Sequence, residues 1–207
     1  MSFHPKMSYG ATFHKSARTL APEDPGAPFV YTPENRARLD EILQRYPADR
    51  KRSAVLPALY LVQYQQGYIT AGAMRYVAGL LEITPADVED VVSYYTMFYT
   101  RPLGTFVINV CRTLSCALNG AERVTEALSA KLGIRPGETD ASGTFTLMEV
   151  ECLGACDRAP AVMVNDAWHE CVTPASVPGL IDDLRARGEA ALSGCHHVIE
   201  TGHKAKG

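Results

Sequence analysis

The sequence has no long hydrophobic run. In 207 residues, no stretch approaches the roughly 18 consecutive apolar residues that indicate a membrane-spanning helix, and the apolar runs are short, such as ALYLV at residues 58–62. Residues 1–30 lack the apolar segment of a secretory signal, and their Pro, Gly, Ser and scattered charges predict a flexible N-terminal arm. The sequence therefore predicts a cytoplasmic protein with no direct membrane insertion.

An excess of basic charge is also missing. The chain has 20 Lys and Arg against 23 Asp and Glu, a net charge of −3, so it lacks the electrostatic footprint of a nucleic-acid-binding protein. Neither a G-x-G-x-x-G motif after a strand nor a P-loop occurs, and the chain therefore offers no nucleotide site of its own.

The C-x-x-C spacing of a thioredoxin-type redox site is absent as well. Four of the six cysteines form two pairs instead. Cys111 and Cys116 are spaced C-x4-C, Cys152 and Cys156 are spaced C-x3-C, and 35 residues separate the pairs. In a reducing compartment, such cysteines are metal ligands or redox groups more often than structural disulfides.

Chemistry alone leaves three interpretations of the four thiols open. A structural zinc site usually shows C-x2-C twice, so the spacing here is atypical for zinc. A [2Fe–2S] cluster needs four thiolates, two for each iron, and two local pairs would supply them. Small residues near the cysteines, such as Gly154 and Ala155, let the backbone approach the sulfurs of a negatively charged cluster. Unliganded thiols are the third alternative.

The first half of the chain predicts a small helical bundle at residues 31–100. Thr32 and Thr84 are expected N-caps, each followed by a proline, and Asp87 completes a variant capping box. Gly67 is a plausible helix stop. The aromatic segment YYTMFYT at residues 94–100 is expected to pack in the core, with packing against a second domain or a partner as the alternative. The four helical segments are residues 32–47, 53–67, 70–82 and 84–96.

A different pattern begins at residue 101 and predicts an α/β domain to residue 188, followed by a C-terminal tail at residues 189–207. The expected order is β-α-β-β-β-α, which is compatible with a thioredoxin-like arrangement. Asn165–Asp166 is the expected hairpin turn, and Thr173 the expected N-cap of the last helix. The expected elements are strands 105–110, 143–151, 161–165 and 168–173 and helices 119–133 and 173–188.

Both cysteine pairs follow the carboxyl ends of predicted strands. Functional loops of parallel or mixed α/β sheets lie at that edge. Two loops from neighbouring strands would therefore bring the four sulfurs together.

Longer segments of the sequence resemble a known family. NVCRTLSCALNGAE, GETDASGTFTLMEVECLGACDRAPAVMVND and ECVTPASV resemble the thioredoxin-like [2Fe–2S] ferredoxin domain found in the E subunit of NADH:quinone oxidoreductase, and LPALYLVQYQQGYIT and VVSYYTMFYTRPLG resemble the helical part of that subunit. The resemblance covers roughly residues 32–175. It implies an α+β chain in which Cys111, Cys116, Cys152 and Cys156 bind one [2Fe–2S] cluster.

The resemblance also implies a function. The chain would be a non-catalytic electron-carrier subunit in the NADH-oxidising module of respiratory complex I, peripheral to the inner membrane. Its partners would be the larger subunit that binds NADH and FMN, and other subunits of the peripheral arm. The alternatives are the equivalent subunit of an NAD-dependent formate dehydrogenase or a bidirectional hydrogenase, or a non-redox interaction module stabilised by zinc.

Several other residues carry weaker expectations. Cys171 is expected to be a small buried residue within strand 168–173. Arg112 and Arg158 lie close to the cysteines in sequence and are expected either to raise the reduction potential or to point to solvent. Pro160 stands where thioredoxin-like folds often have a cis proline. His169 is expected at the surface or in packing. The remaining candidates are expected in a docked tail, with adventitious zinc binding as the alternative: Cys195, His196, His197 and His203.

Overall fold

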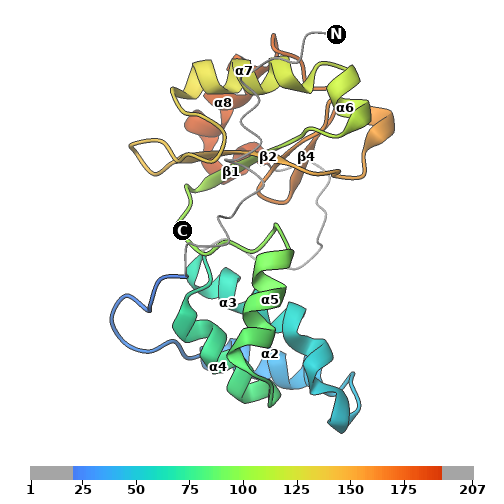
Figure 1. Ribbon diagram of the computed structural model, residues 1–207. Coiled ribbons are helices and arrows are strands. Elements are labelled where there is room, and N and C mark those ends of the chain that lie inside the picture. The colour runs from blue at the N-terminus through green and yellow to red at the C-terminus, as the bar shows by residue number, and fades with distance from the viewer. Residues whose placement is uncertain (1–20, 193–207) are drawn as a thin grey trace. The chain divides into compact units, whose positions relative to one another are not determined.

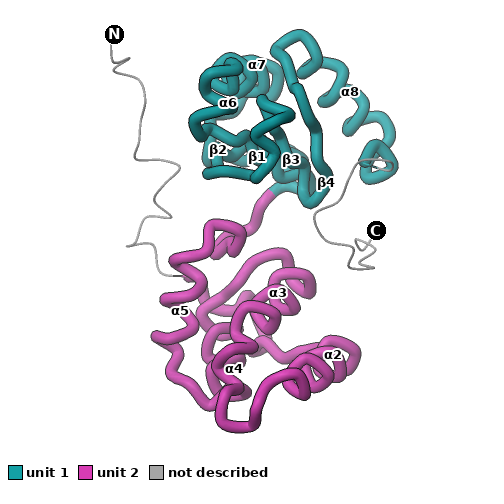
Figure 2. The backbone as a smooth tube through the Cα atoms, turned by 90° about the vertical axis from the view of Figure 1, so that its right-hand side faces the viewer, with its two compact units in different colours: residues 1–12, 104–207 teal, residues 13–103 magenta. Residues whose placement is uncertain are grey.

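The structure is a computed structural model that describes residues 21–192. The chain folds into two compact units, coloured separately in Figure 2, with the division between Leu103 and Gly104. Most of the predicted N-terminal arm and of the predicted tail lies outside the described residues, and so do Cys195 and the three histidines near it.

The helical unit contains the four helices predicted from the sequence. Between the first and second of these helices, the basic run of residues 49–53 forms part of a 3₁₀ helix, η1. Leu39, Leu59, Leu81 and Phe98 are buried in the centre of this unit. The elements are α2 Pro33–Leu43, η1 Ala48–Ala54, α3 Val55–Gln66, α4 Ala71–Leu81 and α5 Pro85–Tyr94 (Figure 1).

Threonine side chains cap the N-termini of three of these helices. Thr32 Oγ1 accepts a hydrogen bond from Asn35 N at 3.2 Å, and Thr70 Oγ1 accepts one from Ala73 N at 3.1 Å. At α5 the predicted capping box is present. Thr84 Oγ1 accepts a hydrogen bond from Asp87 N, and the Asp87 carboxylate accepts one from Thr84 N. These bonds satisfy backbone N–H groups that have no partner within the helix.

We expect Thr84→Ala to lower the free energy of unfolding of the helical unit by about 1 kcal/mol, because the first turn of α5 loses its side-chain acceptor. Thr84→Ser keeps the hydroxyl and should retain most of the stability. Urea denaturation followed by circular dichroism measures both. Equal midpoints for Thr84→Ala and the parent protein would show that the capping box contributes nothing.

The aromatic segment at residues 94–100 behaves only partly as predicted. Phe98 is fully buried and Tyr95 packs against the same core, with a ring-centroid distance of 6.4 Å between them. Tyr94 and Met97 are exposed. Core packing therefore accounts for only part of this segment.

The second unit is built on a mixed four-stranded sheet with the order β2-β1-β3-β4. β1 and β2 are parallel, with Phe106 opposite Phe145 and Cys111 opposite Val150. β3 runs antiparallel to both β1 and β4. The strands are β1 Phe106–Cys111, β2 Phe145–Val150, β3 Val162–Val164 and β4 Ala167–His169. The predicted α+β class is confirmed, and the predicted order β-α-β-β-β-α is observed with one additional short helix after the first strand.

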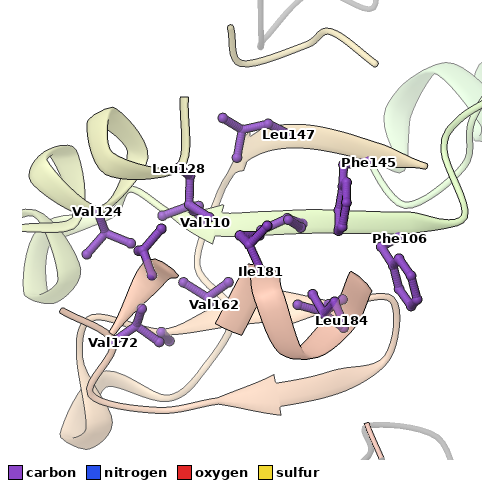
Figure 3. Packing of buried hydrophobic residues seen from close by; sticks show 14 of the residues in the cluster. Phe106, Val110, Val124, Leu128, Phe145, Leu147, Val162, Val172, Ile181 and Leu184 are labelled. Atoms are coloured by element: carbon purple, nitrogen blue, oxygen red, sulfur yellow. The ribbon is translucent and has the colours of Figure 1, made fainter. Parts of the chain in front are cut away.

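Helices α7 (Ala121–Leu132) and α8 (Val177–Arg187) lie side by side on one face of this sheet in Figure 1. Alternate strand residues face them, as the pleat of a strand requires. Figure 3 shows the result, a core in which Val124 and Leu128 of α7 and Ile181 of α8 meet strand residues such as Val110. This core fixes the register of β1 and β2, and hence the positions from which the cysteine loops leave the sheet.

In this unit one predicted helix start is wrong, and one short helix was not predicted. The last helix begins at Val177 and not after Thr173, because Thr173 and Ser176 close a turn through reciprocal side-chain hydrogen bonds. A short helix, α6 (Leu114–Leu118), precedes α7, and Gly120 with φ of +92° separates the two.

Asn165, at the predicted hairpin turn, has φ of +54°, a conformation that asparagine tolerates better than most residues.

Candidate metal centre

The two cysteine loops leave the sheet at the same edge. Because β1 and β2 are parallel neighbours, their carboxyl ends lie together. Arg112 N donates to Val150 O at 3.1 Å, which extends the pairing past the end of β1. In Figure 1, α6 and the loop that follows β2 lie at one end of the unit. The structure thus brings the two predicted pairs to one edge.

The first pair is buried. Cys111 is the last residue of β1, and Cys116 lies in the middle of α6; each residue is only 2% exposed. Leu114 and Leu118, on the same short helix, are more than three-quarters exposed. α6 therefore turns its cysteine inward and two leucines toward solvent.

The second pair is exposed. Cys152 lies in the loop after β2, and Cys156 begins the 3₁₀ helix η2 (Cys156–Arg158). Their Sγ atoms are 3.9 Å apart. Ser115 Oγ donates to Cys156 O at 2.9 Å, and this hydrogen bond ties α6 to η2. The two loops are therefore joined directly beside the cysteines.

Hydrogen bonds surround the sulfur of Cys111. Its Sγ is 3.2 Å from Thr113 Oγ1, and the backbone N–H groups of Leu153 and Thr113 also donate to it. Burial raises the pKa of the Cys111 thiol, but these three donors and a hydrogen bond with Cys116 together outweigh it, and the pKa lies below its ordinary value. These hydrogen bonds stabilise the thiolate of Cys111, the form that binds metals, relative to the thiol.

The other sulfurs have fewer donors. The N–H of Ala161 donates to Cys116, while burial and the neighbouring Cys111 raise the pKa of Cys116. Gly154 N donates to Cys152 Sγ at 3.4 Å. The hydrogen bond and the charge of Cys152 raise the pKa of Cys156, and the charge of Cys111 adds to this. Each loop thus raises the pKa of a cysteine on the other: Cys156 acts on Cys116, and Cys111 acts on Cys156.

The arrangement fits an iron–sulfur cluster. Two thiolates on one tetrahedral metal with bonds of about 2.3 Å stand about 3.8 Å apart, which the 3.9 Å between Cys152 and Cys156 matches. Among residues 21–192, no group of three or more His, Cys, Asp or Glu side chains is placed to hold a metal ion, so the match rests on the distance within the exposed pair. A two-iron cluster requires two thiolates at each iron, and each local pair of cysteines would supply two.

Arg112 and Arg158 both have carboxylate partners. Arg112 Nη2 is 3.6 Å from Glu151 Oε1, and Arg158 lies 3.6 Å from Asp157 and 3.8 Å from Glu170. Each of these two positive charges near the cysteines is thus accompanied by a negative one. An influence of the two arginines on a reduction potential stays a prediction.

The expectation for Cys171 is wrong. β4 ends at His169 because its partner β3 is only three residues long, and Cys171 lies beyond it, exposed, with φ of +50°. Its backbone N–H donates to Arg158 O at 2.8 Å.

His169 is half-buried, and burial lowers its pKa, so the neutral ring is favoured. The Ala159–Pro160 peptide bond is cis, the conformation that the sequence analysis considered for Pro160.

The fold and the cysteine edge together define a small iron–sulfur protein of the thioredoxin-like type. The chain belongs to the thioredoxin-like [2Fe-2S] ferredoxin family, whose model matches residues 39–185. The resemblance seen in the sequence is confirmed, and the predicted cofactor is the cluster that the family carries. None of the helices within residues 21–192 has the length and apolar character that crossing a bilayer requires.

Relatives give this family assignment more detail. The chain is 43% identical over 165 residues to the E subunit of NADH-quinone oxidoreductase from Mycobacterium bovis, a match that covers 78% of this chain and 65% of the relative. It is 39% identical over 158 residues to the protein of the same name from Rickettsia bellii, covering 76% of this chain and 95% of the relative. The chain thus spans about two-thirds of the mycobacterial protein and almost all of the rickettsial one.

A solved structure shares the fold. The crystal structure of an NAD+-reducing [NiFe]-hydrogenase in the air-oxidized state matches with a TM-score of 0.58 and 20% sequence identity, covering 69% of this chain and 25% of that one. At this level of identity, the likeness shows a shared fold.

Proposed function

We propose that the chain is an electron-transfer subunit that holds one [2Fe–2S] cluster through Cys111, Cys116, Cys152 and Cys156. The observation that carries this proposal is the arrangement of two cysteine pairs, one buried and one exposed, at a single edge of the sheet. When bound, the cluster supplies one-electron redox chemistry. The family, defined by this type of cluster, supports the assignment.

The chain's own residues hold and insulate the cluster. The buried pair anchors it against the core of the sheet, and the N–H groups of Leu153, Gly154 and Ala161 stabilise the negative charge on the sulfurs. No proton donor or nucleophile is needed, because electron transfer makes and breaks no bond in a substrate. The chain therefore acts as a carrier with no substrate site of its own.

The proposed partner is the flavin-bearing, NADH-binding subunit of an NADH:quinone oxidoreductase, with which the cluster exchanges electrons through FMN. The names of the mycobacterial and rickettsial relatives support this assignment, as do the exposed positions of Cys152 and Cys156, since a donor must approach the cluster closely. Leu114 and Leu118 offer exposed apolar surface beside them. Other subunits of the peripheral arm would complete the assembly.

Electron paramagnetic resonance tests the proposal on anaerobically purified protein, before and after dithionite, with iron and acid-labile sulfide assayed on the same sample. We expect a signal of a reduced binuclear cluster, with two irons and two sulfides per chain. NADH should produce the same signal only when the flavin subunit is added. A colourless, silent protein with one zinc per chain would contradict the proposal and favour a structural module.

A further inference from the structure

Thr113 occupies the N-cap position of α6 without capping the helix. Its backbone is extended, with φ of −77° and ψ of 171°, yet its side chain makes no hydrogen bond to the first turn. Thr32, Thr70 and Thr84 hold the same position in longer helices, and each of them caps with its hydroxyl. Threonine is a preferred N-cap residue, so the different behaviour of Thr113 needs a reason.

The reason is the sulfur of Cys111. Thr113 Oγ1 lies 3.2 Å from Cys111 Sγ, within hydrogen-bonding distance, and the geometry allows either atom to donate. Metals bind cysteine as the thiolate, which has no proton. With Cys111 as a ligand, the hydroxyl must therefore be the donor and the sulfur the acceptor.

This hydrogen bond differs from the others at the sulfurs. Backbone N–H groups of Leu153, Ala161 and Gly154 also donate to cysteines, but their number and direction follow from the fold. The Thr113 hydroxyl belongs to a side chain, and a substitution removes it without altering the backbone. Cys111 is the sulfur to which it adds a third donor.

We propose that Thr113 tunes the reduction potential of the cluster by donating a hydrogen bond to Cys111 Sγ. The inference rests on the proposed function, since it requires Cys111 to be a cluster ligand. Reduction adds one electron from an external donor, here dithionite or the partner flavin, and leaves the thiolates more negative. A hydrogen bond to a sulfur stabilises the more negative form more strongly, so it raises the potential. Thr113 is thus a tuning residue and not a ligand.

The test is a redox titration of the whole protein followed by electron paramagnetic resonance. Thr113→Val removes the hydroxyl and keeps the branched shape of the side chain. We expect its equilibrium constant for reduction to fall by about tenfold, a negative shift of about 59 mV for a one-electron couple. Thr113→Ser keeps a hydroxyl at the same carbon and should titrate close to the parent protein.

Ser115→Ala is the matched control. It removes a hydroxyl from the same helix, but that hydroxyl donates to the carbonyl oxygen of Cys156 and not to a sulfur. A midpoint near that of the parent supports a specific effect at Cys111, whereas a shift as large as that of Thr113→Val would overturn it.

The outcomes separate the two proposals. A parent protein without a two-iron signal contradicts the proposed function itself. A parent with the signal, together with a Thr113→Val variant that titrates at the same midpoint, overturns the role of Thr113 alone. If the Thr113→Val variant assembles no cluster, the midpoint of Thr113→Ala, which has a smaller side chain, is measured instead. An unchanged midpoint for Thr113→Ala likewise overturns the role of Thr113.

Discussion

Cys156→Ala is expected to abolish the stable two-iron cluster and leave the fold intact. The side chain of Cys156 is exposed, and it is not among the core residues of the sheet unit. Its loss leaves the exposed pair with one thiolate, so one iron lacks a protein ligand. Iron and sulfide content, visible absorbance and the dithionite-reduced resonance signal should all fall to a small fraction of the parent values, while far-ultraviolet circular dichroism stays unchanged.

Cys171→Ala is the matched control for this substitution. Cys171 is also exposed, and its backbone N–H donates to Arg158 O in the segment that begins at Cys156. We expect two irons per chain and an unaltered signal. If Cys171→Ala lost the cluster and Cys156→Ala kept it, the proposed ligand set would be wrong.

Gly104→Ala is expected to destabilise the sheet unit by about 3 kcal/mol, in the upper part of the range for overpacking a tight site. A Cβ atom at residue 104 would lie 2.8 Å from Phe145 N and from the carbonyl carbon and oxygen of Thr144. These are backbone atoms at the start of β2, so the strand itself would have to move. Gly104 N also donates to Thr146 Oγ1 at 2.7 Å, and that bond would stretch.

Gly179→Ala is the control for this second substitution. It lies in α8 of the same unit, and a Cβ atom there would meet no atom within 4 Å. Alanine in a helix is favoured over glycine by up to about 1 kcal/mol, so this variant should be as stable as the parent or slightly more stable. Urea denaturation that gives Gly104→Ala the midpoint of the parent would contradict the tight contact with β2.

Local sequence signals predicted much of this fold because their physical causes are local. Thr84, Pro85 and Asp87 specify the start of α5 through hydrogen bonds that span three residues. Gly67 ends α3 with φ of +89°, which a glycine adopts at little cost. Each of these signals acts within about one turn of helix, so neighbouring residues in the sequence are enough to reveal it.

Features that depend on pairing between distant segments were predicted less well. Cys171 was expected within a long strand, but the length of β4 is set by its partner β3. Gly104 precedes the first expected strand and carries no local signal of a contact, although it packs against β2, about 40 residues further along the chain. α6 was missed because a helix of five residues leaves no periodic pattern to detect.

The sequence by itself determined the class of protein, because the two cysteine pairs and the segments around them identify both the family and its cluster type. Only the tertiary structure decided the surroundings of the sulfurs: Cys111 and Cys116 buried, Cys152 and Cys156 exposed, and donors drawn from Thr113, Leu153, Gly154 and Ala161. The physical reason is distance along the chain. Residues 111 and 161 become neighbours only when β1 pairs with β3, and no local pattern encodes that pairing.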